Sequence, residues 1–351
     1  MTTVQSAVVV KPTRPWLAKP SQRLQSVGVF LLALAISFGV VAATSMKGKL
    51  AYAAIFFIAF TALDYLLSYF TLGKSAAKDV VARGFIVSGM VIVTAPILSI
   101  LVTVLFRGYK GIHASMFTTD MRASSMNDPV ASGGLMHALI GTFLMVAIAL
   151  IISVPLGILT ALYLTEIRGR FTKPIAFLVQ AMSGVPSIVA GLFILSALIY
   201  TVAHAYSGIM GSLALSILMI PTIARTSEEV LLLIPPDLRE AGVALGGTQW
   251  RTVALVVVPA ARSGLVTAMI LGIARVAGET APLLLVAGGS DQNNLNPFHG
   301  PMASLPYYVW KAYSFGSVES VRRAWAGILV LLVIVLVLFT TARFLSARKG
   351  K

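Results

Sequence analysis

Two opposite charges lie four residues apart within an apolar stretch of this 351-residue chain. Arg275 and Glu279 interrupt residues 270–287, a run that otherwise has the composition of a membrane-spanning helix. A charge at the centre of a bilayer costs roughly 2.5–3.5 kcal/mol on insertion scales, so such side chains usually face a bundle interior or a water-filled path. Their i, i+4 spacing predicts that both lie on one helix face, where they can pair, although Gly278 and Pro282 loosen the helix around them. The span therefore lines a route for a charged solute, or it holds a structural ion pair that locks helices together.

The composition decides the class of protein. Hydrophobic residues make up 58% and charged residues 11% of the chain, and the mean hydropathy is +0.91. A soluble domain carries about 25% charged residues, so the composition indicates an integral membrane protein. The chain has no cysteine, which excludes disulfides, thiolate metal sites and a cysteine nucleophile. The net charge of +15 lies mostly in short loops between apolar runs, which favours a role in topology and contact with anionic lipids of the bilayer over nucleic-acid binding.

Apolar runs of about 20 residues are long enough to cross a bilayer. On that rule the sequence predicts eight membrane spans, at about residues 27–46, 50–72, 84–106, 137–164, 175–203, 209–224, 263–289 and 323–345. Both termini are predicted to be cytoplasmic, because most of the 27 Lys and Arg residues then fall on the cytoplasmic side. The chain divides into a basic cytoplasmic arm (1–26), a transmembrane hairpin with its linker (27–83), a core (84–346) and a cytoplasmic tail (347–351).

The one long cytoplasmic segment, residues 225–262, is predicted to hold a short helix between two turns. The pair Pro235-Pro236 stops the preceding helix, and Asp237 can cap the next one. That helix covers residues 238–245 and ends at Gly246-Gly247. A helix of two turns is marginal alone and needs to pack against something.

Two features suggest what the short helix packs against. Thr248 can cap a third helical piece that runs to Pro259, so the short helix is held across the membrane surface. Its apolar side carries Leu238, Ala241 and Leu245 at i, i+3 and i+7. This side fits a groove on a partner protein, or it is the apolar side of an ordinary amphipathic surface helix.

A pattern within this segment resembles the EAA loop of the permeases of ABC importers. The matching residues are Glu240-Ala241-Gly242, Gly246 after three further residues, and Val256, Val258 and Pro259. The chain departs from the family pattern at Gly242, Val256 and Val258, where the family has Ala, Ile and Leu. The resemblance implies that the short helix docks on an ATPase, with Arg239, Glu240, Ala241, Gly242, Gly246 and Pro259 as coupling residues.

Longer stretches are similar to the phosphate-specific members of this family, PstA and PstC. They are Arg225-Thr226-Ser227-Glu228-Glu229, Pro235, Leu238-Arg239-Glu240-Ala241, Ala274-Arg275, Gly278-Glu279-Thr280-Ala281-Pro282-Leu283, Val185-Pro186-Ser187-Ile188-Val189 with Gly191, and Gly133-Gly134 before Gly141-Thr142. The run from Gly278 to Pro282 favours PstA over PstC. The similarity covers about residues 84–346, and the hairpin before it departs from the usual six-span plan, which leaves its role open.

The resemblance implies an all-α integral membrane fold, with a MetI-like permease core of six helices plus the N-terminal two-helix hairpin. It also implies an inner, cytoplasmic membrane of a prokaryote and three protein partners: a PstC-like second permease, a PstB-like ATPase dimer and a PstS-like extracytoplasmic phosphate-binding protein. The chain itself has no Gly-x-x-x-x-Gly-Lys-Ser/Thr loop, and its four histidines lack metal-ligand spacing. We therefore expect a transport subunit that is not an enzyme and binds no metal or cofactor, with ATP and Mg used by the partner ATPase.

For the substrate path, the resemblance implies Arg275, Glu279 and Thr280. A guanidinium can form two parallel hydrogen bonds to phosphate oxygens, so we predict that Arg275 contacts phosphate transiently at the interface with the second permease. Glu279 holds Arg275 in place, or accepts the proton of HPO4. A buried Arg275–Glu279 pair that only locks helices remains an alternative.

Three other functions stay open on the sequence alone. A secondary carrier would use Arg275 and Glu279 as an ion-coupled relay and would need no ATP. A membrane scaffold or sensor would bind partners without flux. A permease of the same family for another oxyanion or small solute is the third, because one arginine binds many anions.

Overall fold

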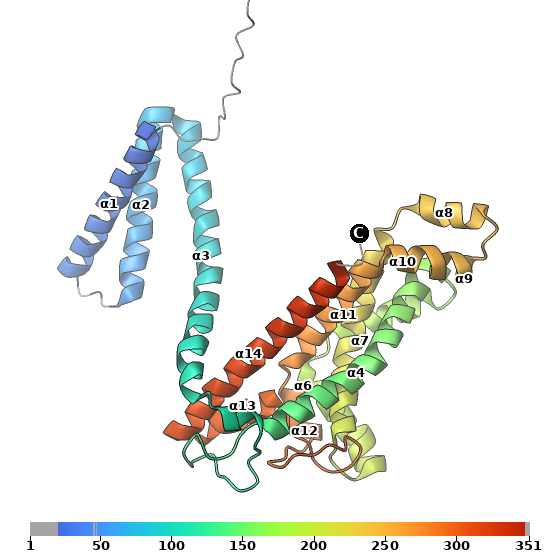
Figure 1. Cartoon of the computed structure of the whole chain (residues 1–351). Coiled ribbons are helices and arrows are strands. Elements are labelled where there is room, and N and C mark those ends of the chain that lie inside the picture. Colours follow the sequence, from blue (N-terminus) through green and yellow to red (C-terminus); the bar gives the residue numbers. More distant parts are fainter. Residues whose placement is uncertain (1–19, 45, 47, 348–351) are drawn as a thin grey trace, which may run out of the picture. The chain divides into compact units, whose positions relative to one another are not determined.

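The computed structural model describes residues 20–44, 46 and 48–347, and this part of the chain is helical, with one isolated bridge between Gly288 and Met302. Residues 1–19 of the predicted arm and 348–351 of the predicted tail lie outside the described residues. The chain divides into two compact units, one ending at Ile100 and one beginning at Leu101. Figure 1 labels most of their helices.

The first unit holds α1 (Pro20–Ala43), α2 (Lys49–Leu72) and most of α3 (Lys74–Gly108). Aromatic pairs hold the first two helices together, with ring centroids 5.2 Å apart for Phe30 and Phe56. Gly73, at φ +90°, separates α2 from α3. The third helix begins ten residues before its predicted span, because the basic linker is itself helical.

The second unit contains the remaining helices. They are α4 (Met136–Leu162), α5 (Thr172–Ser183), α6 (Ser187–Ile194), α7 (Gly208–Leu232), α8 (Pro236–Ala244), α9 (Gln249–Thr252), α10 (Val258–Ala260), α11 (Arg262–Ala277), α12 (Ala281–Val286), α13 (Leu305–Phe315) and α14 (Val318–Ala347). Short 3-10 turns are η1 (Tyr109–Gly111) and η2 (Ala114–Phe117), and π-helical turns are η3 (Tyr163–Ile167), η4 (Leu195–Ala203) and η5 (Val253–Val257).

Six described helices are long and apolar enough to cross a membrane, and two bent pairs bring the number to as many as eight. The bent pairs are α5 with residues 187–203, at 105°, and residues 249–260 with α11, at 72°. Six of the eight predicted spans therefore correspond to single long helices. The fifth is broken at Gly184-Val185-Pro186, and the seventh, 263–289, overlaps the second bent pair only in part. The predicted span 209–224 is wrong at its end, because Pro221 lies inside α7, which continues to Leu232.

The central helix of the second unit is α7. Ile223 on this helix is fully buried and packs in one cluster with residues of α4 and α11. A Cβ added to Gly157 would lie 2.7 Å from Ile223 Cγ2, and one added to Gly272 would lie 2.8 Å from Ile223 Cγ1. These two glycines therefore let α4 and α11 approach α7 closely from two sides.

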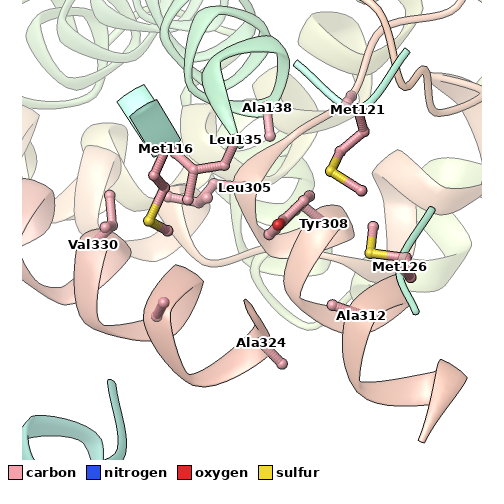
Figure 2. Packing of buried hydrophobic residues seen from close by; sticks show 12 residues of the cluster. Met116, Met121, Met126, Leu135, Ala138, Leu305, Tyr308, Ala312, Ala324 and Val330 are labelled. Carbon is pink, nitrogen blue, oxygen red and sulfur yellow. The ribbon is translucent and has the colours of Figure 1, made fainter. Parts of the chain in front are cut away.

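Residues 109–135 and α13 form a packed cap at the end of the second unit that lies away from α8 (Figure 1). Met116, Met121 and Met126 pack with Leu135 and Tyr308 in its core (Figure 2). Methionine side chains adapt to irregular gaps, which suits a cap made from a segment with little regular structure.

Arg323 of α14 ties this cap to the helices. Its side chain is buried, and its Nη2 donates to the carbonyls of Pro129 at 2.8 Å and Asp128 at 3.2 Å, and also to that of Ser132. A buried charge is tolerated only where it is hydrogen-bonded. The guanidinium therefore fixes the backbone of residues 128–132 against α14.

Candidate functional site

The predicted substrate span breaks between Arg275 and Glu279. Helix α11 ends at Ala277, α12 begins at Ala281, and Glu279 N donates to Val276 O at 3.1 Å in the turn between them. A proline at 282 has no N–H for the carbonyl of residue 278, so a continuous helix would leave that carbonyl unpaired. The prediction that Arg275 and Glu279 share one helix face is wrong, as is the single span 263–289.

Arg275 instead reaches a different helix. Its Nη1 donates to the Thr222 hydroxyl of α7 at 3.1 Å, across 53 positions of sequence. The Arg275 side chain is exposed, whereas Glu279 and Thr280 are half-buried. Among the described residues no ion pair joins Arg275 to Glu279. Arg275 is therefore held on α7 by a neutral hydroxyl, and no carboxylate of the described residues pairs with its charge.

A second arginine lies one helical turn along α7 from Thr222. Arg225 donates from Nη2 to Gln180 Oε1 of α5 at 2.8 Å, and its Nη1 lies 3.1 Å from Glu228 Oε2. Its Nε is buried without a partner. Thr222 and Arg225 of the span Gly208–Leu232 and Arg275 of α11, which reaches Thr222, together form what we call the cationic strip.

Sequence reasoning missed Arg225 as a site residue, because the predicted span 209–224 ends one residue before it and Arg225 falls in the segment predicted to be cytoplasmic. The signal was present in the apolar pattern: the buried positions Leu215, Leu218, Ser227 and Leu231 continue at helical spacing through the proline. The strip lies on a face of α7 that the described residues cover only in part, since Thr222 and Arg225 are half-buried and Arg275 is exposed. Two cations on a partly covered face of a span need water, an anion or a partner helix.

At the other site, α8 is fixed to the end of α4 by a bidentate ion pair. Arg239 Nη2 lies 2.7 Å from Glu166 Oε1, and Arg239 Nε donates to Glu166 Oε2 at 2.9 Å. Arg239 also donates to the carbonyls of Ile234 at 2.7 Å and Leu231 at 2.9 Å. These bonds satisfy backbone acceptors at the C-terminal end of α7. The hydrogen bond to Glu166 raises the pKa of Arg239 above its usual value. This one side chain therefore sets the position of α8 relative to α4 and α7.

The ends of α8 follow the predicted turns, with one exception. Gly246 has φ +82°, the left-handed conformation that glycine adopts at helix ends. Thr248 caps α9, and its hydroxyl accepts from Arg251 N at 3.5 Å. The predicted cap at Asp237 is wrong: Pro235 occupies the N-cap position and Asp237 lies in the first turn.

The departure at Gly242 has a local cause. A Cβ at this position would lie 2.5 Å from Thr252 Cγ2, so α8 and α9 approach too closely there for alanine. In contrast, Gly246 has open space around it. The two glycines are thus required for different reasons, close packing at one and backbone conformation at the other.

The outward side of α8 and its turn is apolar. Leu238 is 40% and Leu245 90% exposed, and Val243 and Trp250 are exposed as well. Glu240 and Ala241 are also exposed, and Pro259 lies exposed just before the 72° bend into α11. The predicted coupling residues are therefore brought together at one end of the second unit, apart from the half-buried Arg239 and Gly242, which hold the helix in place.

Comparisons with known proteins agree with this architecture. Residues 153–351 match the family described as "Binding-protein-dependent transport system inner membrane component". The chain is 38% identical over 278 residues to the "Phosphate transport system permease protein PstA 1" of Mycobacterium tuberculosis (strain ATCC 25618 / H37Rv), covering 78% of this chain and 90% of the relative. It is 37% identical over 255 residues to the PstA protein of Pasteurella multocida (strain Pm70), covering 72% and 88%.

A solved structure shares the fold. The chain is similar, with a TM-score of 0.50 and 19% identity, to a chain of the MetNI methionine ABC transporter in an inward-facing conformation. The match covers 62% of this chain and 95% of that chain. The predicted all-α fold with a MetI-like permease core is therefore confirmed.

Proposed function

The chain belongs to the family of binding-protein-dependent transport system inner membrane components, and from this premise we propose that it is a permease subunit of an ATP-driven importer of inorganic phosphate. The relatives that are named phosphate permeases match over about nine tenths of their length. The observation that carries the proposal is the cationic strip: two arginines lie within or beside a membrane span, on a face that the described residues cover only in part.

The strip suits a dehydrated phosphate ion. Phosphate near neutral pH is an anion, and leaving water costs it the hydrogen bonds that a guanidinium can replace in bidentate fashion. Arg275 is held by a single neutral hydrogen bond, so it can turn toward a passing anion without breaking an ion pair. Arg225 shares its charge with Glu228, which makes it the weaker contact of the two.

Glu279 and Thr280 remain candidates for the same path. They lie in the turn between α11 and α12, directly after the helix that carries Arg275. The Glu279 carboxylate does not pair with Arg275 in the described structure, which supports a role as acceptor of the proton of HPO4 over a role as a brace for the arginine.

The partly covered face is the natural place for a second permease subunit. In the proposed assembly a PstC-like permease covers the cationic strip, so the phosphate path runs between the two chains. A PstB-like ATPase dimer binds α8 through Leu238, Leu245 and Trp250, and supplies the ATP and Mg chemistry. A PstS-like binding protein delivers phosphate at the end that carries the cap.

Coupling would follow from chain connectivity. The segment from α8 leads through α9 and α10 into α11, which carries Arg275 near its end. A shift of α8 imposed by an ATPase can therefore reach the strip through one continuous stretch, biasing inward and outward openings by differential contacts. In the proposed orientation α8 is cytoplasmic and the membrane is the inner membrane of a prokaryote.

The experiment is reconstitution of the purified complex in liposomes. Radiolabelled phosphate is added on the side of the membrane that carries the cap, and ATP is supplied on the side that carries α8. ATP-dependent accumulation of phosphate supports the proposal, with sulfate as the control solute. Uptake that follows an imposed ion gradient without ATP would establish the secondary carrier instead. Partner binding without flux under both conditions would establish a scaffold or sensor.

A further inference from the structure

A basic pocket lies beside the first turns of α14, away from both sites described above. Its cavity of about 360 Å³ is lined by Arg107, Lys110, Ser317, Arg322 and Trp325, with Gly316, Val318 and Val321. All of these residues belong to the second unit. Neither phosphate passage nor docking of an ATPase uses this pocket.

Close packing of backbones builds the pocket. A Cβ on Gly108 would lie 2.8 Å from Trp325 O, and one on Gly111 would lie 2.8 Å from Arg322 O. These two glycines let η1 lie directly against α14. Arg107 directly precedes Gly108, and Lys110 directly precedes Gly111. The contact therefore fixes both cations beside Arg322 on the neighbouring helix.

The positive charge of the pocket is only partly compensated. Arg322 pairs with Glu319 at 2.8 Å, and the same carboxylate accepts from Val130 N at 3.3 Å. Arg107 lies over the Trp325 ring, 5.3 Å from its centroid. In the described part of the chain Lys110 has no ion-pair or hydrogen-bond partner, so one carboxylate faces three cations.

Two other cations at this end of the second unit are satisfied by the protein, whereas Arg122 of the cap is exposed. Arg323 is bound by backbone carbonyls, and Lys311 forms an ion pair with Asp291 at 2.7 Å. Basic residues are disfavoured on the side of a membrane opposite the cytoplasm, and this end is the one predicted to lie there. Three cations at one pocket on that side therefore call for an anionic ligand.

The surroundings of the pocket identify the kind of anion. Phe106 is 73% exposed, Tyr109 77% and Val318 70%, so large apolar side chains flank the cations directly. Trp and Tyr side chains beside basic residues are typical of the level where lipid headgroups meet acyl chains. Ser317 Oγ accepts from Ser320 N at 3.2 Å and so begins α14, whose amino end adds positive potential toward the pocket.

We propose that this pocket binds the phosphate group of an anionic phospholipid, with Arg107, Lys110 and Arg322 as the charged contacts and Trp325 as the wall. The acyl chains then lie along Phe106 and the neighbouring apolar surface. Free inorganic phosphate shares the headgroup chemistry, but it makes no use of the exposed apolar residues. The lipid would tie η1 to α14 and so support the cap that Arg323 anchors.

The test is native mass spectrometry of the purified, assembled complex after exchange into detergent containing either phosphatidylglycerol or phosphatidylcholine. The double variant Arg107→Gln/Lys110→Gln is compared with the wild type and with Arg122→Gln, an exposed arginine of the cap outside the pocket. We expect retained phosphatidylglycerol to fall at least tenfold in the double variant and to stay unchanged in Arg122→Gln.

Three outcomes would overturn the proposal. Equal retention of phosphatidylcholine would mean an apolar crevice without headgroup recognition. Displacement of phosphatidylglycerol by millimolar inorganic phosphate would mean a free-phosphate site. Unchanged retention in the double variant would place the lipid elsewhere. The variant Lys110→Arg, which keeps the charge at a position without a stacked ring, should retain the lipid as the wild type does and so controls for an effect of substitution on folding.

Discussion

Replacing Glu166 by Gln should release α8 from the end of α4. The substitution keeps the size and shape of the side chain and removes the negative charge that Arg239 contacts at 2.7 and 2.9 Å. The Glu166 side chain is only 6% exposed and that of Arg239 27%. Water therefore screens this pair much less than a surface ion pair, although the arginine keeps some contact with solvent.

The magnitude follows from the kind of bond that is lost. Hydrogen bonds to charged groups contribute about 1.5–3 kcal/mol each, and the partial exposure of Arg239 favours the lower half of that range for the pair as a whole. A cost of about 2 kcal/mol corresponds to a roughly 30-fold shift toward the released position of α8, since 1.36 kcal/mol is a factor of ten. Arg239 keeps its two carbonyl acceptors, which limits the loss.

Hydrogen–deuterium exchange of residues 236–252 measures this shift in the purified chain, without any assumption about transport. Protection should fall by about the same factor of 30 over α8 and its turn, and not over α7. Asp237→Asn is the matched control, because it removes one carboxylate from α8 that has no ion-pair partner in the described part of the chain. In the assembled complex Glu166→Gln should raise the ATP consumed per phosphate imported.

The double variant Glu166→Gln/Arg239→Gln separates the pair from its members. If the reasoning holds, the second substitution adds less than its own single effect, because the interaction is already lost. Unchanged protection of α8 in Glu166→Gln would refute the assignment of this ion pair as the device that positions the helix.

The remaining predictions concern single contacts. Gly242→Ala should destabilise the α8–α9 turn by about 1–3 kcal/mol through overpacking and lower phosphate uptake by the assembled complex. Adding Thr252→Ser, which removes the methyl group 2.5 Å from the added carbon, should restore much of that uptake. Gly246→Ala should cost about 1–2 kcal/mol through its φ of +82°, and a change at residue 252 should not rescue it. Arg225→Gln should lower the maximal rate of phosphate uptake in an assembled complex, whereas Gln180→Ala, which removes only its neutral partner, should have a smaller effect. Arg323→Leu should leave the carbonyls of Asp128 and Ser132 without their donor, and that of Pro129 with Ser132 N alone. It should therefore expose residues 109–135 to limited proteolysis, with Arg122→Leu as the unaffected control.

The turns around α8 could be predicted because their signals are local. Pro235-Pro236, Gly246 and Thr248 act within a few residues of their own position, through a missing N–H, a left-handed φ and a hydroxyl cap. Only the cap at Asp237 was wrong, since the proline before it already begins the helix. Six of the predicted spans are likewise single long helices in the structure, since the length of an apolar run is a local signal too.

The contacts that give these elements a function could not be predicted from local patterns. Thr222 and Arg275 are 53 positions apart, and Glu166 and Arg239 are 73 apart. No local pattern around Glu166 indicates which residue it pairs with. The need for glycine at 242 depends on where Thr252 lies, which is a property of the packed turn. Arg225 was missed because the predicted span ends at residue 224. The helix instead continues through Pro221 to Leu232, since a proline within a long helix is tolerated when neighbouring helices pack around it.

The break at Gly278 shows how two signals can conflict. The apolar run from 270 to 287 is long enough for one span, and the i, i+4 spacing of its charges fits one helix face. Gly278 and Pro282 together interrupt the helix between Ala277 and Ala281, where the ion pair between Arg275 and Glu279 would form. The loss of the pair changes the chemistry, because it frees the Arg275 charge for a ligand.

Phosphate uptake by the assembled complex that carries Arg275→Leu tests the central claim most directly. The substitution removes the charge and one hydrogen bond to Thr222 but no ion pair, so assembly and ATP hydrolysis without phosphate should persist. We predict that ATP-dependent phosphate uptake falls at least tenfold, since charge-assisted bonds contribute about 1.5–3 kcal/mol. Normal uptake in an assembled complex would contradict the claim that phosphate passes Arg275.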